Sequence, residues 1–270
     1  MENVQNLKFI DIEKVDGSIA AIIGKQNDFQ KASMKQEDWW NVKVKNSKYV
    51  NYMIANLAEL GEAVDSLNYK WWGKDVSDDM ENFITEGIDA IHFCISYHLQ
   101  IMGGNQEALA EPIKFALLTV EASNLMEARD SEGRRAALYD ALIHFNGSSS
   151  LVYMKLTALD DNDEQTEEWK QDILNTIYQT YKNLFSMLYI AGVDDFAEIE
   201  RRYMVKNALN LVRKLNGYED GTYVKTWLSP LGVEGEDNKI ALEVVKNAGL
   251  SQFDQIVTEL DNYYKNTVGL

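Results

Sequence analysis

Four acidic residues, arranged as two pairs, are the part of this sequence best suited to chemistry. Glu59 and Glu62 form one pair, and Glu86 and Asp89 form the other. Residues three apart in a helix share a face, with Cβ atoms about 5–6 Å apart, so each pair presents two carboxylates together. Both pairs stand among apolar residues, and burial disfavours charged carboxylates unless a divalent cation is present. All-oxygen ligands of this kind predict a site for Mg²⁺ or Mn²⁺ rather than zinc.

A second group of residues has the opposite charge. Residues 201–225 carry six basic residues against two acidic ones, although the whole chain has a formal charge of −17. Lys206, Asn210 and Arg213 are four and three residues apart, which places a cation, an amide and a guanidinium on one helix face. Such a face is suited to binding phosphate. Standing alone, it is equally well interpreted as a solvated basic surface.

The elements that must position these residues are expected to be helices. Only two prolines occur in 270 residues, and apolar residues recur at spacings of three and four, so the sequence predicts an all-α protein with few strands. The expected helices are 6–29 with an interruption at 16–17, 48–68, a helix capped by residues 77–79 that runs to 101, 107–130, 134–156 with an interruption at 147–150, 167–190 ended by Gly192, and one or two closing helices within 239–270.

Composition excludes several classes of protein. The strong negative charge argues against binding DNA or RNA polymers, whose phosphates would be repelled. We find no apolar run of the ~18–20 residues that cross a bilayer and no signal peptide, so we expect no membrane partner. The one cysteine, Cys94, is expected to be a small buried residue. A disulfide framework is excluded, which fits a cytoplasmic location.

The acidic pairs belong to a longer pattern. Lys70-Trp71-Trp72 lies between them, and His92-Phe93 follows the second pair. The pattern Glu-x-x-Glu-Ala, Lys-Trp-Trp, Glu-x-x-Asp-x-x-His-Phe resembles the one shared by the dimeric all-α dUTPases, which belong to the all-α nucleoside-triphosphate pyrophosphohydrolases. A bare Trp-Trp is more often part of a core, but in this family the turn lies at the active site.

The basic region resembles the second signature of the same family. That signature is Lys-Asn-x-Leu-Asn-x-x-Arg, then Gly-Tyr-x-x-Gly-x-Tyr-x-Lys-x-Trp, then Glu-Asp-Asn. Here it begins at Lys206, continues from Gly217 to Trp227 and ends at Asn238. The two signatures together cover roughly residues 52–99 and 203–238.

The resemblance implies a fold and an activity. It implies one all-α catalytic domain over residues 1–270, a multi-helix bundle with a core at about 1–101 and 169–240 and a variable helical insertion at about 103–168. The implied reaction is Mg²⁺-dependent hydrolysis of dUTP to dUMP and pyrophosphate, with dUDP as a further substrate, which limits uracil incorporation into DNA. A homodimer is also implied. We expect it to use the aromatic residues of the long helix 167–190, namely Trp169, Tyr178, Tyr181, Phe185 and Tyr189.

The resemblance also implies residue roles. Glu59, Glu62, Glu86 and Asp89 are the expected metal ligands, and Glu62 is also expected to orient or deprotonate the attacking water. The expected substrate contacts are Asn27, Lys70, Trp71, His92, Phe93, Lys206, Asn210, Arg213, Tyr218 and Lys225. Among these, Lys70 is assigned to phosphate, His92 to the sugar and Phe93 to the base. The family's Gln-x-x-Leu-Asn base motif matches only in part, because Asn27 aligns with its Asn but Ile23 stands at the Gln.

Two alternatives remain at this point. One is a related enzyme that acts on dCTP as well as dUTP, or on another deoxynucleotide. The other is an inactive helical dimer that serves as a binding module, although such a module has no need of both signatures.

Overall fold

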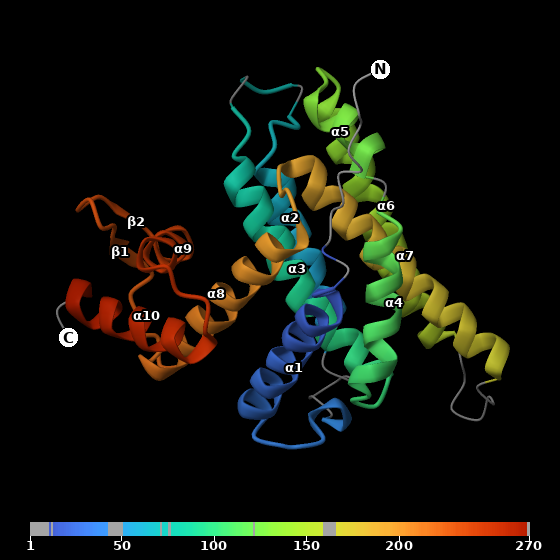
Figure 1. Ribbon diagram of the computed structural model, residues 1–270, viewed down its shortest axis with the longest axis horizontal. Coiled ribbons are helices and arrows are strands. Elements are labelled where there is room, and N and C mark those ends of the chain that lie inside the picture. Colours follow the sequence, from blue (N-terminus) through green and yellow to red (C-terminus); the bar gives the residue numbers. More distant parts are fainter. Residues whose placement is uncertain are drawn as a thin grey trace. The chain divides into compact units, whose positions relative to one another are not determined.

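The computed structural model describes residues 11, 13–42, 51–70, 72–74, 77–120, 122–158 and 166–268. The chain divides into two compact units, Met1–Ile199 (unit 1) and Glu200–Leu270 (unit 2). Ten α-helices account for nearly all the regular structure in the described residues, which confirms the predicted all-α class (Figure 1).

Unit 1 is built around one buried helix, α3. Its elements are α1 (Val15–Met34), the 3₁₀ turn η1 (Trp39–Asn41), α2 (Tyr52–Asp65), α3 (Met80–Ile101), α4 (Gln106–Leu118), α5 (Ala122–Asp130), α6 (Arg134–Thr157), α7 (Glu167–Ala191) and the first residues of α8 (Phe196–Leu215). Helix α3 packs against α1, α2, α4 and α7 and is buried along most of its length. The second acidic pair therefore lies on the most enclosed helix of the unit.

Local sequence signals explain where several helices begin. The Asp79 side chain accepts a hydrogen bond of 2.9 Å from the Asn82 backbone N–H, which caps α3 at the predicted position. The Asn51 side chain caps α2 in the same way, at 3.2 Å from the Ile54 N–H. Helix α7 ends as predicted at Gly192, which has a positive φ of 122°. The two helices that carry the acidic pairs thus have defined starting points.

The structure differs from the predicted helices at three places. Helix α1 begins at Val15 and runs to Met34, so residues 16–17 form its first turn instead of an interruption, and an acidic residue is favourable there. Residues 1–10 lie outside the described part of the chain. The predicted helix 107–130 is divided into α4 and α5. Helix α6 continues through residues 147–150, where the Ser148 hydroxyl donates to the His144 carbonyl of its own helix at 2.9 Å.

Unit 2 combines helices with a small hairpin. After the rest of α8 come β1 (Thr226–Leu228), β2 (Glu234–Glu236), α9 (Asp237–Ala248) and α10 (Phe253–Val268). The strands are antiparallel, with Trp227 opposite Gly235. Both closing helices contact β1, and Trp227 and Tyr264 are fully buried between these elements. The closing helices predicted within 239–270 are confirmed.

A helix must be both long and apolar to span a membrane. No helix among the described residues combines the length and the apolar character needed to span a membrane.

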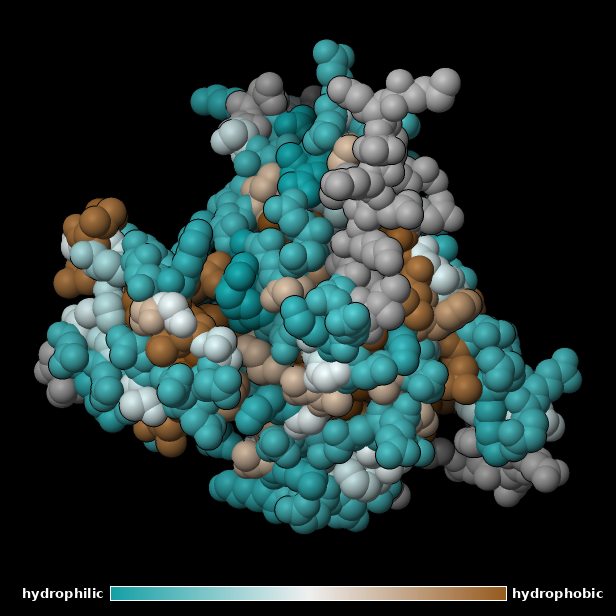
Figure 2. All heavy atoms as spheres, viewed as in Figure 1, coloured by the Kyte–Doolittle hydropathy of each residue, from teal (hydrophilic) through white to brown (hydrophobic). Residues whose placement is uncertain are grey.

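Cys94 is buried as predicted, and burial raises the pKa of its thiol to about 12, so it is a poor nucleophile at neutral pH. Exposed apolar side chains gather at the tip of the β1–β2 hairpin, where Leu231 is 85% exposed, and along α4 and α6 (Figure 2).

Candidate active site

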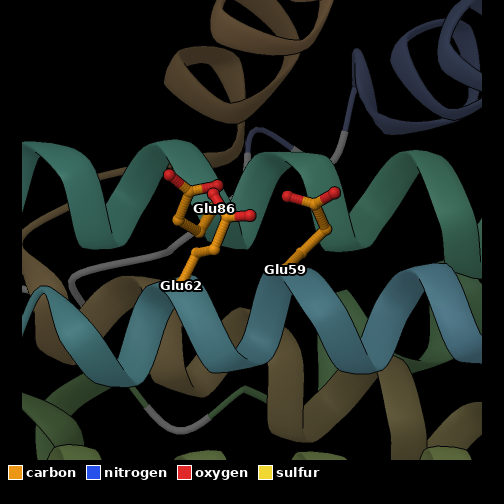
Figure 3. A group of neighbouring side chains, drawn as sticks. All are labelled: Glu59, Glu62 and Glu86. Carbon is orange, nitrogen blue, oxygen red and sulfur yellow. The ribbon is translucent and has the colours of Figure 1, made fainter.

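The helices α2 and α3 pack side by side and bring three of the predicted carboxylates together. Each of Glu59, Glu62 and Glu86 offers one oxygen within 4.8 Å of the other two. Figure 3 shows Glu59 and Glu62 reaching from α2 toward α3, with Glu86 close to Glu62. The i,i+3 spacing places the first two on one face of α2. The pairing of α2 with α3 adds the third.

The chemistry of these three side chains fits a divalent cation. Two oxygens that bind one Mg²⁺ at about 2.1 Å lie at most about 4.2 Å apart, so small side-chain movements would close the group around an ion. The three residues also differ in exposure, because Glu86 is 7% exposed, Glu59 is intermediate and Glu62 is exposed. The cluster therefore has a buried end at Glu86 and a solvent-facing end at Glu62.

Asp89, the fourth predicted ligand, lies outside this close group. It follows Glu86 by three residues on α3 and is buried. Its role as a metal ligand stays a prediction.

Gly87 allows α3 to approach α7 closely beside the carboxylates. A Cβ atom at this position would lie 2.6 Å from Leu188 Cδ2 and 3.5 Å from Met187 Cε, both on α7. The glycine beside Glu86 therefore has a packing role: it sets the distance between α3 and α7.

The turn between α2 and α3 carries Lys70. Its ammonium forms a loose ion pair with Asp65 at 3.8 Å and lies 5.3 Å from the centre of the Tyr69 ring. Trp72 is exposed and packs edge-on against Tyr69. Trp71 lies outside the described residues. The position of Lys70 on the surface is compatible with its predicted contact to phosphate.

His92 is held in one orientation on α3. It is buried, and its Nδ1 lies 3.0 Å from the Ile88 carbonyl oxygen. A carbonyl only accepts hydrogen bonds, so Nδ1 carries the hydrogen. The next residue, Phe93, is half-buried.

Asn27, the predicted base contact, is one of three buried carboxamides on α1. Its Oδ1 accepts a hydrogen bond of 2.9 Å from Trp39 Nε1. Gln26 and Gln30 both donate to Ser96 Oγ on α3, at 2.8 and 3.0 Å. No role was predicted for these glutamines, although they continue the buried helix face of Ile22 and Ile23, which is a recognisable signal.

In unit 2, the predicted phosphate face is joined to a carboxylate. Arg213 binds Asp237 through one edge of its guanidinium: Nε donates to Oδ2 at 2.9 Å, and Nη2 donates to Oδ1 at 2.7 Å. The two side chains are only 12% and 2% exposed. Tyr223 donates a third hydrogen bond to Asp237 at 2.8 Å. Burial, followed by the adjacent carboxylate, raises the pKa of the Tyr223 hydroxyl, so it stays protonated.

The remaining residues of the basic face surround this ion pair. Lys206 Nζ and Arg213 Nη2 both donate to Asn238 Oδ1 at 3.0 Å, and Arg213 Nη1 donates to Asn210 Oδ1 at 3.3 Å. Lys206, Asn210 and Arg213, which the spacing placed on one helix face, are therefore joined by hydrogen bonds through Asn238 and Arg213 itself. Asp237 and Asn238 belong to the second signature, but no role was predicted for either residue.

Tyr218 and Lys225 extend the basic face through a glycine turn. Gly217 and Gly221 adopt positive φ angles of 86° and 71°, which only glycine adopts without cost. The exposed Tyr218 ring lies 5.9 Å from the Arg213 guanidinium and 5.5 Å from the Lys225 ammonium. One aromatic face thus contacts two cations.

Comparison with known proteins gives the family. The family model described as dUTPase matches residues 19–218, about three quarters of the chain. The match includes all four predicted carboxylates, as well as Lys206, Asn210 and Arg213. No curated protein matches the sequence. An all-helical chain whose carboxylate pairs and basic helix both lie within this match belongs to the all-α dUTPase family, and it is a dUTP diphosphatase.

Proposed function

We propose that this dUTP diphosphatase requires Mg²⁺ held by Glu59, Glu62 and Glu86, with Asp89 as a further ligand, and that Mn²⁺ can replace it. The observation that supports this proposal is the convergence of three carboxylate oxygens within 4.8 Å from two helices. When bound, the ion supplies positive charge for the phosphates and lowers the pKa of a water molecule.

Glu62 is the residue that we assign to the attacking water. It lies at the exposed end of the carboxylate group, whereas Glu86 is buried. A carboxylate at that end can accept a hydrogen bond from water, orient it and take its proton. Glu59 and Glu86 then serve as ligands only.

The nucleoside contacts follow from the orientation of the buried polar groups. Because His92 Nδ1–H is directed at the Ile88 carbonyl, a contact to the sugar would use Nε2. Because Trp39 donates to Asn27 Oδ1, a contact to the base would use the amide nitrogen of Asn27 as donor. The ring of Phe93 is the surface that we assign to base stacking.

The phosphate contacts are assigned to the basic face of unit 2. The charge of Arg213 is neutralised by Asp237. Lys225 is exposed, and its ammonium lies over the Tyr218 ring. Lys225 therefore offers the stronger net charge to a phosphate, and Arg213, Lys206 and Asn210 offer oriented donors. Lys70 and Trp71 are proposed as further contacts from unit 1.

A pyrophosphate-release assay tests the substrate and the metal together. Each deoxynucleoside triphosphate is supplied with Mg²⁺, with Mn²⁺ and with EDTA, and dUDP is tested separately by release of orthophosphate. We expect turnover of dUTP and dUDP that EDTA abolishes. Comparable turnover of dCTP would favour the related enzyme that accepts both bases. Full activity in EDTA would contradict the metal proposal.

A homodimer is also proposed, but its expected surface needs correction. Tyr181, Phe185 and Tyr189 of α7 are buried inside unit 1, because α4, α5 and α6 pack on that helix. The other two predicted residues, Trp169 and Tyr178, are half-buried, and Tyr178 lines a surface groove. Exposed apolar residues lie instead on α4 and α6, beside a groove of about 770 Å³ that includes Phe115, Ile143 and Leu151. We propose that a second copy of the chain packs there.

Light scattering tests the dimer. The expected mass is about twice the 30.8 kDa of one chain. Ile143→Lys should reduce the measured mass to that of one chain, and a wild-type monomer at low micromolar concentration would refute the proposal. A cytoplasmic location suits an enzyme that acts on the deoxynucleotide pool, and it is part of the same proposal.

A further inference from the structure

We propose that α6, in the helical insertion, positions the α2–α3 helix pair that carries the carboxylates, with Ser149 and Arg135 as the positioning residues. This inference rests on the proposed Mg²⁺ site and gives a role to a segment for which the sequence predicted none.

The first contact joins α6 to α2 one turn before Glu59. Ser149 is 1% exposed, and its Oγ accepts a hydrogen bond from Asn56 Nδ2 at 3.3 Å. The same hydroxyl donates to Met53 Sδ at 3.3 Å. A single serine therefore contacts two residues of α2 that are three apart and share one face. This contact fixes both the rotation of α2 and its position along its axis.

Asn56 extends the contact to α3. It is also 1% exposed, and its Oδ1 accepts a weak hydrogen bond from Cys94 Sγ on α3 at 3.9 Å. The buried carboxamide thus has partners on both neighbouring helices. A buried amide that loses a partner is left unsatisfied, so this arrangement favours one register of α2 against α3 over the alternatives.

The second contact joins the start of α6 to the turn that carries Lys70. Arg135 Nε donates to Asp78 Oδ2 at 3.0 Å, and Asp78 Oδ1 accepts a hydrogen bond of 2.7 Å from the Asn68 backbone N–H. Arg135 and Ser149 are 14 residues apart, which is about 21 Å along a helix. Helix α6 therefore contacts the helix pair near both ends.

The carboxylate site needs such support because its own charges oppose it. Glu59 and Glu62 on α2 lie within 4.8 Å of Glu86 on α3, and like charges at this distance tend to separate the two helices. Asn56 contacts both Ser149 on α6 and Cys94 on α3 without any metal, so these bonds hold α2 beside α3 against the repulsion. Metal affinity should therefore depend on α6.

Ser149→Ala tests the contact, and Ser148→Ala is its matched control. Ser148 is the adjacent residue, but its hydroxyl accepts from Asn183 Nδ2 on α7 at 3.2 Å and so supports a different helix. Mn²⁺ binding is measured without nucleotide by electron paramagnetic resonance, and thermal stability is measured in EDTA. We expect Ser149→Ala to weaken Mn²⁺ binding by about 10-fold, the lower end of the effect seen when groups that orient metal ligands are removed. Ser148→Ala should bind as wild type.

Arg135 provides an independent test on a half-exposed residue. Arg135→Ala should raise the KM for dUTP at saturating Mg²⁺ by a factor of a few while kcat stays unchanged, because the Lys70 turn is less well ordered. Arg135→Lys should restore the KM by re-forming the ion pair with Asp78.

The outcomes separate this inference from the proposal on which it rests. Equal Mn²⁺ affinity in the Ser149→Ala and Ser148→Ala proteins would overturn the positioning role alone. A Ser149→Ala protein that melts at a lower temperature in EDTA but binds Mn²⁺ as wild type does would show a purely structural residue. Wild-type protein that binds no Mn²⁺ would overturn the metal site and the positioning role together.

Discussion

The carboxylate group of unit 1 and the basic face of unit 2 differ in how their charges are arranged. In unit 1, three acidic side chains converge within 4.8 Å. In unit 2, Arg213 is neutralised in place by Asp237, with two hydrogen bonds and almost no exposure to solvent. Like charges that converge cost free energy until a cation binds, whereas a buried ion pair keeps its geometry without a ligand. The proposed cation would complete the first site, whereas the second is already held in place by its own ion pair.

This difference predicts that the two units respond differently to metal. A ligand that binds only the folded state stabilises the part of the protein that holds it. Mg²⁺ should therefore slow hydrogen exchange in α2 and α3 and leave unit 2 unchanged. Equal protection of both units from hydrogen exchange would show that Mg²⁺ does not bind selectively to unit 1.

The largest expected effect is that of Glu62→Gln. The substitution keeps the size of the side chain but removes the base assigned to the water, so kcat should fall by roughly 10²–10⁴-fold. Removing one of three converging charges should leave the melting temperature in EDTA unchanged or slightly higher. Mg²⁺ should then raise the melting temperature by less than in wild type. Activity within a few-fold of wild type would exclude Glu62 from its assigned role.

Arg213→Ala and Lys225→Ala should separate stability from phosphate binding. Loss of Arg213 leaves the buried Asp237 carboxylate without its cation, which typically costs about 3–5 kcal/mol of stability. Loss of the exposed Lys225 should leave the unfolding transition unchanged and cost on the order of 1.5–3 kcal/mol in kcat/KM for dUTP. Denaturant unfolding and steady-state kinetics measure the two quantities. Equal stability of the two variants would mean that unit 2 does not depend on its ion pair.

The sequence predicted local features of both sites well. Apolar periodicity placed α2 and α3, the cap residues at 77–79 placed the start of α3, and the i,i+3 spacing placed Glu59 beside Glu62. It also placed Lys206, Asn210 and Arg213 on one face of α8. These features depend on residues within one or two helical turns, which is the range that a sequence pattern reports.

Features that depend on how elements pack were not predictable in the same way. Glu86 joins Glu59 and Glu62 while Asp89 lies outside the group, because the axial offset of α2 against α3 decides which turn of α3 faces the pair. The Arg213–Asp237 ion pair connects residues 24 apart through the β1–β2 hairpin. Tyr181, Phe185 and Tyr189 of α7 were assigned to a dimer because the insertion that covers them carried no recognisable signal.

A smaller effect is expected from Gly87→Ala, which tests the support of the carboxylate site from the side of α7. The added methyl group would meet Leu188 at 2.6 Å, and overpacking of this kind costs about 1–3 kcal/mol. Thermal unfolding measures the loss. Gly61→Ala is the matched control, since a Cβ at Gly61 on α2 meets nothing within 4 Å and alanine favours helix. If both variants were stabilised, α3 and α7 would not be in close contact at Gly87.

The two units are also expected to differ in how much stability they lose at acidic pH. All three histidines, His92, His98 and His144, belong to unit 1. His98 is fully buried, with Nδ1 3.1 Å from the Tyr181 hydroxyl, and burial lowers its pKa from 6.5 to about 3. Its neutral form is therefore part of the folded state. Unit 2 contains no histidine, so it should lack this source of acid sensitivity.

The direction in which stability changes with pH follows from which state binds the proton more tightly. Because the pKa of His98 is lower in the folded state, the unfolded chain binds the proton first, and stability falls as the pH drops from about 6.5 toward 3. Between pH 6.5 and pH 5 the loss is about 2 kcal/mol, at 1.36 kcal/mol for each pH unit. His98→Gln removes the titrating group and should flatten this part of the stability curve, whereas His144→Gln, on the exposed side of α6, should not. Hydrogen exchange at pH 7 and pH 5 should locate the loss in unit 1, and a parallel loss in unit 2 would assign it to groups other than His98.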